Sequence, residues 1–318
     1  MFQLAEEIKG AGSIGISGHI RQDGDCVGSC MALYLYLKKC VGPETEVSVY
    51  LEPPADVFAD IEGIAEIKKP DETDTPPELF FALDCESSRL GDARRLFDGA
   101  GRRINIDHHI SNTGCGMVNV VDPGASSTSE VVYRLLDRSR IDAEIAKALY
   151  IGIIHDTGVF QYSNTSPETL RIAAELVSHG FDFSALIQKT FYEKTYIQNQ
   201  IMGRALLESI LFLHGRGIVS VVDRKVMDFY NAVPQDLDGI VSLLRNTKGV
   251  ECAIFMYETD AMVYKVSMRS SDLVDVAKIA SYFGGGGHKK AAGCTMSGTF
   301  HDVVNNLSLH IERQLEEA

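Results

Sequence analysis

The sequence contains no C-x-x-C pair, and its seven cysteines are scattered at irregular spacings. Neither a disulfide framework nor a thiolate zinc site is therefore expected, and free thiols fit a reducing compartment. No apolar run reaches the roughly 18 residues that a transmembrane helix needs. The first ten residues indicate a short amphipathic helix instead of a signal peptide. We therefore expect a cytoplasmic protein that does not associate with membranes.

The chain also has fewer basic than acidic residues. Lys and Arg number 30 against 44 Asp and Glu, which gives a formal net charge of −14 over 318 residues. Proteins that coat long nucleic acid need a basic surface for phosphate contacts, so this balance argues against that class. The net charge does not exclude a binding site for small anions, because bound cations can reverse the charge locally. The length favours two domains of about 150 residues each.

Several common active-site motifs are absent as well. There is no P-loop and no G-x-S-x-G elbow, which disfavours nucleoside triphosphatases and serine hydrolases. Residues 10–15 satisfy G-x-G-x-x-G, but they precede the first expected strand and no acidic residue follows about 20 positions later. We interpret this glycine-rich segment as a turn between a helix and a strand.

The first half of the chain alternates short apolar or β-branched runs with helical patterns. Strands are expected at Ser13–Ser17, Glu46–Leu51, Leu79–Leu83 and Arg103–Ile106. Helices are expected at Val27–Lys39, Ser127–Arg138 and Ala143–Ile153. This alternation predicts a doubly wound α/β domain with a mostly parallel sheet.

The second half shows a different organisation. Residues 181–210 carry regular apolar spacing without a strand signal, which indicates connecting helices. Strands are expected at Gly217–Val222, Glu251–Glu258 and Met262–Met268, with a hairpin turn at residues 259–261. We predict a catalytic domain at residues 1–185, a helical linker at 186–210 and a smaller α+β domain at 211–318. The active site is expected in the cleft between the two domains.

Four segments each place Asp or His directly after an apolar run. Together they supply His19, Asp23, Asp25, Asp84, Asp107, His108, His109 and Asp156. Taken singly, such an Asp is more often a helix N-cap or a solvated loop residue. The carboxyl ends of parallel strands, however, lie along one edge of the sheet, and ligands bind in the crevice there.

Several carboxylates in one crevice would repel one another unless divalent cations neutralised them. Two such ions about 3.5–4 Å apart can share a carboxylate and generate a hydroxide near neutral pH. Mixed His and Asp ligation without Cys favours manganese, magnesium or iron over structural zinc. The residues therefore predict a two-metal centre, with cobalt as a further candidate.

In this order the four segments resemble the motifs of the DHH phosphoesterase family, named for the run matched here at residues 107–109. GHIRQDGDCVGS resembles the family's first motif, G-H-x-x-P-D-x-D-x-x-G-S, and departs from it at Gln22. The resemblance implies that one metal ion is held by His19, Asp23 and Asp84. It implies that a second ion is held by Asp25, Asp84, His108 and Asp156, so that Asp84 bridges the two.

The resemblance also assigns roles to residues around the metals. His109 would face the substrate phosphate and protonate or hydrogen-bond the leaving oxygen, while Asp107 would hold the His pair in place. His155 is interpreted as a packing residue. Arg89 and Asn112 match family positions near the site, although a surface salt bridge or a turn explains them equally well.

The second domain contains the glycine-rich segment SYFGGGGHKKAAGCT. The plain interpretation is a flexible loop followed by a turn of surface helix. A functional interpretation is a backbone cradle for an anion, aided by the start of a following helix. The segment resembles the G-G-G-H-x-x-A-A-G signature of the DHH-associated domain of nucleases. That resemblance implies recognition of a terminal phosphate or base by Arg269, Gly286, Gly287 and His288.

The total length resembles the group of the family that acts on short oligonucleotides and on 3′-phosphoadenosine 5′-phosphate (pAp). We therefore expect a manganese-dependent phosphodiesterase that degrades short oligoribonucleotides to mononucleotides and converts pAp to AMP. Its partners would be short oligonucleotides or phosphorylated nucleotides, not long nucleic acid, and a homodimer is left open. Cleavage of cyclic or linear dinucleotide signals such as c-di-AMP or pApA is an alternative. A nucleotide-binding regulatory module is a third hypothesis, from a different class.

Overall fold

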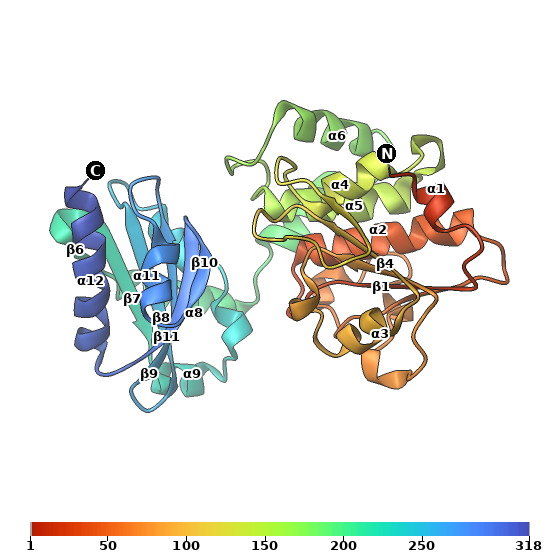
Figure 1. Ribbon diagram of the computed structural model, residues 1–318. Coiled ribbons are helices and arrows are strands. Elements are labelled where there is room, and N and C mark those ends of the chain that lie inside the picture. The colour runs from red at the N-terminus through yellow and green to blue at the C-terminus, as the bar shows by residue number, and fades with distance from the viewer. Residues whose placement is uncertain (1, 318) are drawn as a thin grey trace. The chain divides into compact units, whose positions relative to one another are not determined.

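The computed structural model describes residues 2–317 of the chain (Figure 1). These residues form two compact units, which meet at the bond between Glu193 and Lys194. That point lies within the segment predicted to be a helical linker. The segment predicted as a linker, residues 186–210, holds the end of α7 (Phe183–Ile187), a π-helical turn (Gln188–Tyr192) and α8 (Tyr196–Leu207).

The first unit is built on a five-stranded sheet in the order β2-β1-β3-β4-β5, with every neighbouring pair parallel. Its strands are β1 (Ser13–Ser17), β2 (Glu46–Val49), β3 (Leu79–Leu83), β4 (Arg102–Asp107) and β5 (Val118–Val121). The doubly wound α/β prediction is confirmed. Sequence reasoning missed β5, which has only four residues and no fully buried position, so its apolar signal is weak.

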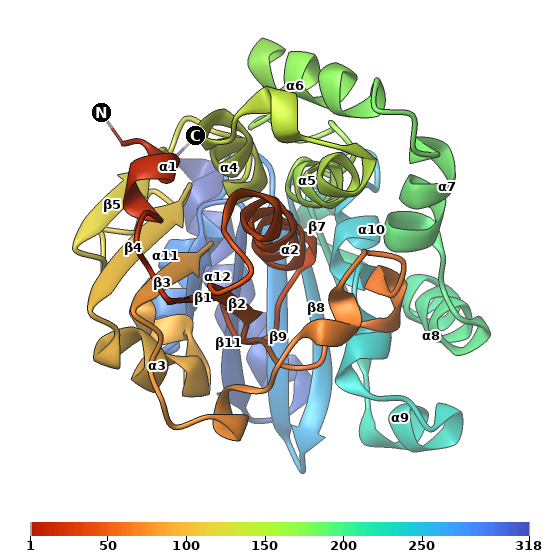
Figure 2. The same cartoon turned by 90° about the vertical axis from the view of Figure 1, so that its right-hand side faces the viewer.

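Helices cover both faces of this sheet (Figure 2). On one face lie α2 (Gly24–Cys40), α4 (Thr128–Leu135) and α5 (Ala143–Asp156), which bury the main apolar core against the strands. On the other face α3 (Arg94–Gly99) closes a smaller core around Phe80 and Phe97. The short α1 (Leu4–Glu7) and the longer α6 (Pro167–Val177) complete the unit.

The strand order creates a topological switch point between β1 and β3. The chain leaves β1 through α2 towards β2 on one side, and it leaves β3 through α3 towards β4 on the other. In open α/β sheets the crevice at the carboxyl ends of two such strands is where ligands bind. His19 follows β1 and Asp84 follows β3, so both residues lie at this point.

Two glycines let α2 and α5 pack in close contact. A Cβ atom on Gly28 would lie 2.5 Å from the carbonyl oxygen of Ala148, and one on Gly152 would lie 2.5 Å from Oδ1 of Asp25. Real Cβ contacts are not this short, so only glycine permits the observed spacing. This contact fixes the first turn of α2 against α5 and thereby places the carboxylate of Asp25.

The second unit contains a six-stranded sheet in the order β10-β11-β9-β8-β7-β6, in which only β7 and β8 pair in parallel. Its strands are β6 (Ile210–Phe212), β7 (Gly217–Val222), β8 (Cys252–Asp260), β9 (Val263–Ser270), β10 (Gly286–His288) and β11 (Ala291–Ser297). Besides α8 it has the helices α9 (Arg224–Tyr230), α10 (Ile240–Arg245), α11 (Val276–Tyr282) and α12 (Phe300–Glu316). The mixed sheet with helices confirms the predicted α+β class.

The helices of this unit cover the two faces of its sheet unequally. One face is buried by α11 and α12 along β8, β9 and β11. On the opposite face α8, α9 and α10 cover β7 and β8. Alternate residues of β9 and β11 on that opposite face stay partly or fully exposed. The sheet therefore presents an open strip along β9, β11 and β10.

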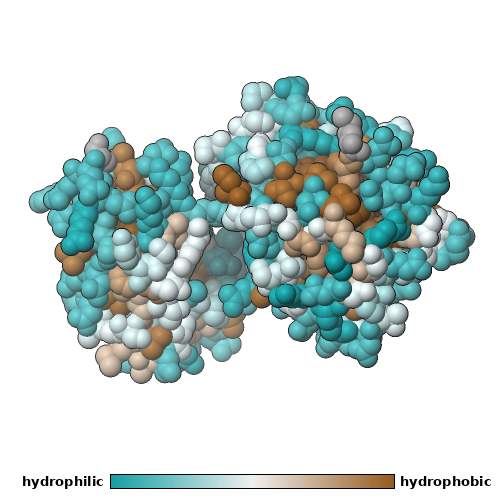
Figure 3. Space-filling view, viewed as in Figure 1, coloured by the Kyte–Doolittle hydropathy of each residue, from teal (hydrophilic) through white to brown (hydrophobic). Residues whose placement is uncertain are grey.

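The surface in view is mainly polar in both units, with scattered apolar patches (Figure 3). Across residues 2–317, no helix combines the length and the apolar character required to cross a bilayer.

Candidate active site

The loop after β1 delivers three of the predicted ligands. His19 is 4% exposed, and its Nδ1 donates a hydrogen bond to the Ile20 carbonyl at 2.9 Å. That bond leaves Nε2 with a lone pair, and Nε2 lies 3.7 Å from Oδ1 of Asp23 and 3.3 Å from Oδ2 of Asp84. Because its other ring nitrogen is already held by a carbonyl, His19 has the tautomer and orientation of a metal ligand.

Asp84 lies at the centre of the site. It is 2% exposed and follows β3 with a φ of 60°, in the left-handed region that Asp tolerates better than most residues. Its backbone N–H donates to the Ile106 carbonyl at 3.0 Å, which ties the turn to β4. The turn points the carboxylate into the crevice, where Oδ1 lies 3.7 Å from Nε2 of His108 and 3.6 Å from Nδ1 of His109.

Asp25 is fully buried at the start of α2 and faces the N-terminus of α4. Its carboxylate accepts hydrogen bonds from the backbone N–H of Thr128 at 2.6 Å and of Ser129 at 2.9 Å. These are unsatisfied helix donors, and the positive end of the helix dipole stabilises an anion there. The hydroxyl of Thr128 also donates to Asp84 at 3.0 Å.

Sequence reasoning missed the contribution of α4. The run SSTSE at residues 126–130 has the pattern of a capping box, and Ser127 does accept the backbone N–H of Glu130. That pattern predicts where a helix begins, but it carries no information about which carboxylates the helix faces.

The DHH run at the end of β4 joins the same cluster. Nε2 of His108 lies 3.0 Å from Oδ2 of Asp156, the last residue of α5. One ligand atom each from Asp25, His108 and Asp156 all lie within 4.8 Å of one another. The structure thus brings together three of the four residues that the resemblance assigns to the second metal ion, and Asp84 adjoins them.

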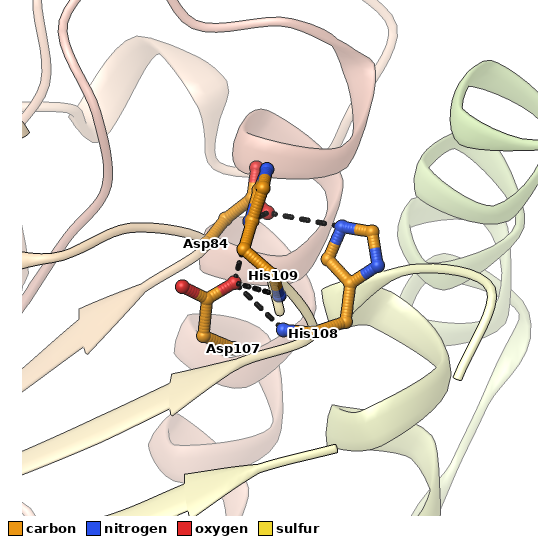
Figure 4. A group of neighbouring side chains, drawn as sticks. All are labelled: Asp84, Asp107, His108 and His109. Carbon is orange, nitrogen blue, oxygen red and sulfur yellow. Dashed lines mark hydrogen bonds and ion pairs between the residues drawn. The ribbon is translucent and has the colours of Figure 1, made fainter. Parts of the chain in front are cut away.

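Asp107 holds the histidine pair in place (Figure 4). Its Oδ1 accepts the backbone N–H groups of His108 and His109 and the Nδ1–H of His109, the last at 2.7 Å. The amide of Asn112 donates to Oδ2 of Asp107 and to Oδ1 of Asn105. Asp107 therefore fixes the orientation of the His109 ring, and Asn112 has a structural partner near the site.

Electrostatics within the cluster are unfavourable without cations. Burial raises the pKa of Asp84 to about 8, and the neighbouring Asp25 carboxylate adds to the effect. Burial and Asp25 likewise raise the pKa of Asp156 to about 7. Burial acts to lower the pKa of His19, but its bonds to Asp23 and Asp84 outweigh that effect and raise it to about 11. The carboxylates therefore need added positive charge to be ionised together.

Divalent cations would supply that charge, and the donor set fits them. Nε2 of the buried His19 and Nε2 of the half-buried His108 lie 3.3 and 3.7 Å from oxygens of the buried Asp84 carboxylate. Further donors come from Asp23, Asp25 and Asp156 at the edges of the same cluster. The arrangement can hold metal ions, and its His and Asp composition suits hard or intermediate cations.

Two other side chains lie beside the cluster. His155 packs against Phe58 and Phe191, with ring centroids 5.5 and 5.6 Å apart, and its ring occupies the space that a Cβ on Gly24 would need. These contacts fit the packing role expected for His155. Cys26 was not predicted at the site, yet its Sγ belongs to one group with ligand atoms of His19 and Asp84.

In the second unit, Arg269 and His288 both stand opposite Ala291 of β11, Arg269 from β9 and His288 from β10. Directly opposed residues share a sheet face, so both side chains belong to the open strip. The small side chain of Ala291 separates them. The structure thus places a guanidinium and an imidazole on one exposed row.

The expected helix after the glycine-rich segment is wrong. Residues 286–288 form β10 and residues 291–297 form β11, joined by Lys289 and Lys290 in a hairpin. Ala292, Cys294 and Met296 are buried while their neighbours are not, which is the two-residue period of a strand. Gly284 and Gly285 instead follow the end of α11, and the first residue of that helix, Val276, donates its backbone N–H to the Lys289 carbonyl at 2.9 Å.

The comparisons with known proteins agree with this geometry. The DHH family, N-terminal domain, matches residues 13–153, and the DHHA1 domain matches residues 215–317. The bifunctional oligoribonuclease and PAP phosphatase NrnA of Thermus thermophilus is 35% identical over 98% of this chain and 93% of its own length. The Bacillus subtilis protein of the same name is 26% identical over 87% of each chain.

Solved structures show the same architecture. The crystal structure of an exopolyphosphatase-related protein from Bacteroides fragilis has a TM-score of 0.87 and 26% identity, covering 98% of this chain and 94% of that one. Exonuclease RecJ bound to manganese has a TM-score of 0.52 at 14% identity over 98% of this chain and 92% of that one, which shows a shared fold. The chain therefore belongs to the DHH family, within the group of bifunctional oligoribonucleases and PAP phosphatases.

Proposed function

We propose that this protein hydrolyses short oligoribonucleotides to mononucleotides and removes the 3′-phosphate of pAp to give AMP. The observation that carries the proposal is the convergence of His19, Asp84 and His108 at the switch point of the parallel sheet. The relatives that match nearly the whole chain are named for these two activities. Both reactions cleave a phosphoester, so one metal centre serves both.

Two divalent cations, which we propose to be manganese, would be held by His19, Asp23, Asp25, Asp84, His108 and Asp156. When bound, they supply Lewis acidity towards a phosphoryl oxygen and lower the pKa of the attacking water. The protein fixes its own ligands through hydrogen bonds: the Ile20 carbonyl holds His19, and the N-terminus of α4 holds Asp25. Asp84 lies between the two groups of donors, which supports its role as the shared ligand.

His109 is the proposed proton donor to the leaving oxygen. Asp107 accepts its Nδ1–H at 2.7 Å, which orients the ring. The side chain is 21% exposed, so a substrate can approach the ring from solvent. Asp107 is fully buried and acts through His109 as a positioning residue.

Substrate recognition is proposed for the open strip of the second unit. Arg269 presents a planar guanidinium suited to a phosphate, and His288 stands on the same row. Gly287 has a φ of 144°, and a Cβ there would lie 2.4 Å from the carbonyl oxygen of Ala291. Glycine is therefore required at Gly287 by the hairpin itself, and Gly286 beside it is open to a ligand, with no atom near its missing Cβ.

The net charge of −14 supports short substrates, because each further phosphate of a long strand meets an acidic protein. We propose the cytoplasm as the location, which agrees with the seven free cysteines. A homodimer stays a prediction.

The experiment is an assay with pAp, pApA, inorganic pyrophosphate and a 5′-labelled RNA series from two to 24 nucleotides, each with manganese or with chelator. We expect manganese-dependent turnover of pAp and RNA, highest efficiency at about two to five nucleotides, and a smaller difference between lengths at higher salt because repulsion is screened. Equal cleavage of the 24-mer and the dimer at low salt would contradict the length preference. Turnover of pApA alone would identify a dinucleotide phosphodiesterase, and tight binding without turnover would identify a binding module.

A further inference from the structure

Cys26 lies in the first turn of α2, next to His19 and Asp84 of the candidate metal centre. Its backbone N–H donates to Oδ1 of Asp23 at 3.0 Å, and its side chain is fully buried. Its Sγ lies 3.8 Å from the carbonyl oxygen of His19. The backbone N–H and the Sγ of Cys26 thus contact two predicted metal ligands, Asp23 and His19.

The sulfur is a member of a compact group of donor atoms. One ligand atom each from His19, Cys26 and Asp84 all lie within 4.8 Å of one another. All three residues are at most 4% exposed, so solvent does not compete for their lone pairs. A group of nitrogen, sulfur and oxygen donors at this spacing can surround a single cation.

The loop backbone holds the sulfur in place. A Cβ on Gly18 would lie 2.3 Å from Sγ of Cys26 and 3.4 Å from Sγ of Cys30. The loop that carries His19 therefore packs directly on the thiol, without a side chain between them. Cys30 lies one turn further along α2 and belongs to no such group of donor atoms among the described residues.

We propose that the Cys26 thiolate is a further ligand of the metal ion next to His19 and Asp84. This inference rests on the metal centre of the proposed function and deepens it. Without metal, the Cys26 thiol donates its proton to the His19 carbonyl, with 3.8 Å between Sγ and that oxygen. Coordination exchanges that proton for the cation, and the proton leaves to solvent.

A thiolate ligand changes which metals the site prefers. Soft sulfur donors favour zinc, cobalt and iron over magnesium and manganese, whereas a site of His and carboxylate alone does not make that distinction as strongly. The position next to His19 would therefore bind zinc or cobalt more tightly than a sulfur-free site would. The other ion position, near His108 and Asp156, contains no such sulfur within its group of donors.

The test is a titration of the metal-free, full-length protein with Co²⁺, followed by absorption spectroscopy. Thiolate-bound Co²⁺ shows an intense charge-transfer band in the near ultraviolet that His and carboxylate ligands do not produce. We expect this band in the wild-type protein and in Cys30→Ser, and its loss in Cys26→Ser and Cys26→Ala. Zinc affinity should fall at least about tenfold in the Cys26 variants, and manganese affinity should fall less.

The outcomes separate this inference from the proposed function. Binding of two Co²⁺ ions by the wild-type protein without the band would overturn the thiolate ligand and leave the metal centre intact. Absence of any cobalt binding would overturn both. The absence of the band from the wild-type spectrum would contradict the thiolate ligand even if the Cys26 variants did not fold.

Discussion

The two units contain candidate phosphate sites of opposite charge. In the first unit the candidate groups are carboxylates, which repel one another until cations arrive, together with histidines, and the central Asp84 is only 2% exposed. In the second unit they are a cation, an imidazole and glycines on a partly exposed strip of sheet. The sign of the charge on the lining side chains therefore does not by itself locate a phosphate site. An acidic crevice can attract phosphate through metals, while a basic strip attracts it directly.

The largest expected effect comes from removing the shared carboxylate. Asp84→Ala should lower turnover by more than about 10³-fold, beyond the usual cost of losing one transition-state donor, and should remove more bound manganese than any other single change. Metal analysis after dialysis, together with steady-state kinetics, measures both quantities. His108→Ala should leave the ion next to His19 in place.

The control for this change is Asp92→Ala, which removes an exposed carboxylate from the same unit and should alter neither metal content nor turnover.

Because burial and Asp25 raise the pKa of Asp84, the metal-free Asp84→Ala protein should unfold at the same or a higher temperature than the metal-free wild type. Full metal occupancy in the variant would show that Asp84 does not bridge the ions.

The second effect concerns the proton donor. His109→Ala should reduce kcat by about 10²–10⁴-fold, the usual contribution of general acid catalysis, with unchanged metal content. The loss should be smaller for a substrate whose leaving group is a stable anion, such as nitrophenolate, because such a group needs no proton. Asp107→Asn should reduce kcat by about 10–100-fold by misorienting His109, and it should shift the pH profile of kcat. An equal loss for good and poor leaving groups would rule out proton donation.

The third prediction concerns the contact between α2 and α5, which positions the Asp25 carboxylate. Gly152→Ala would place a Cβ 1.9 Å from Oγ of Ser129 and 2.5 Å from Oδ1 of Asp25. Overpacking of this kind costs about 1–3 kcal/mol, so the free energy of unfolding should fall by that amount, and metal affinity should fall with it. Denaturant unfolding with and without manganese measures both.

Gly203→Ala in α8 is the matched control, because a Cβ there meets no atom within 4 Å. It should leave metal affinity unchanged and stabilise the helix by up to about 1 kcal/mol. If Gly152→Ala were as harmless as this control, the close contact of α2 with α5 would not be what positions Asp25.

Much of the first unit could be predicted from the sequence. Strands β1 and β3 are long enough in apolar residues that their bounds, Ser13–Ser17 and Leu79–Leu83, match the prediction residue for residue. His19 and Asp84 could be predicted at the site because each directly follows one of these strands. In a parallel sheet the carboxyl ends of β1 and β3 lie side by side, whatever the conformation of the loops that follow them.

The remainder depends on contacts between elements that the sequence does not reveal. Thr128 donates to Asp84 across 44 residues, and Cys26 meets His19 only because Gly18 lets the loop approach α2. The glycine-rich segment was misread for another reason. Its glycines indicated a loop before a helix, whereas the alternation of buried Ala292, Cys294 and Met296 indicated a strand, and this second signal was the correct one. Whether the predicted ligands bind metal stays a prediction.

We propose that the acidic crevice carries out the chemistry and that the strip on β9 and β10 recognises the substrate. The most direct test compares wild type with Arg269→Ala and His288→Ala on two substrates, pAp and bis-p-nitrophenyl phosphate. Loss of a charge-assisted hydrogen bond costs about 1.5–3 kcal/mol, so KM for pAp should rise about 10–100-fold in Arg269→Ala. Lys225→Ala, which removes an exposed charge of the same unit, is the control.

For bis-p-nitrophenyl phosphate, which has no nucleotide to recognise, both variants should retain kcat/KM within about threefold of the wild type, with unchanged manganese content. Equal losses on the two substrates, or loss of bound manganese, would contradict the division of chemistry and recognition between the two units.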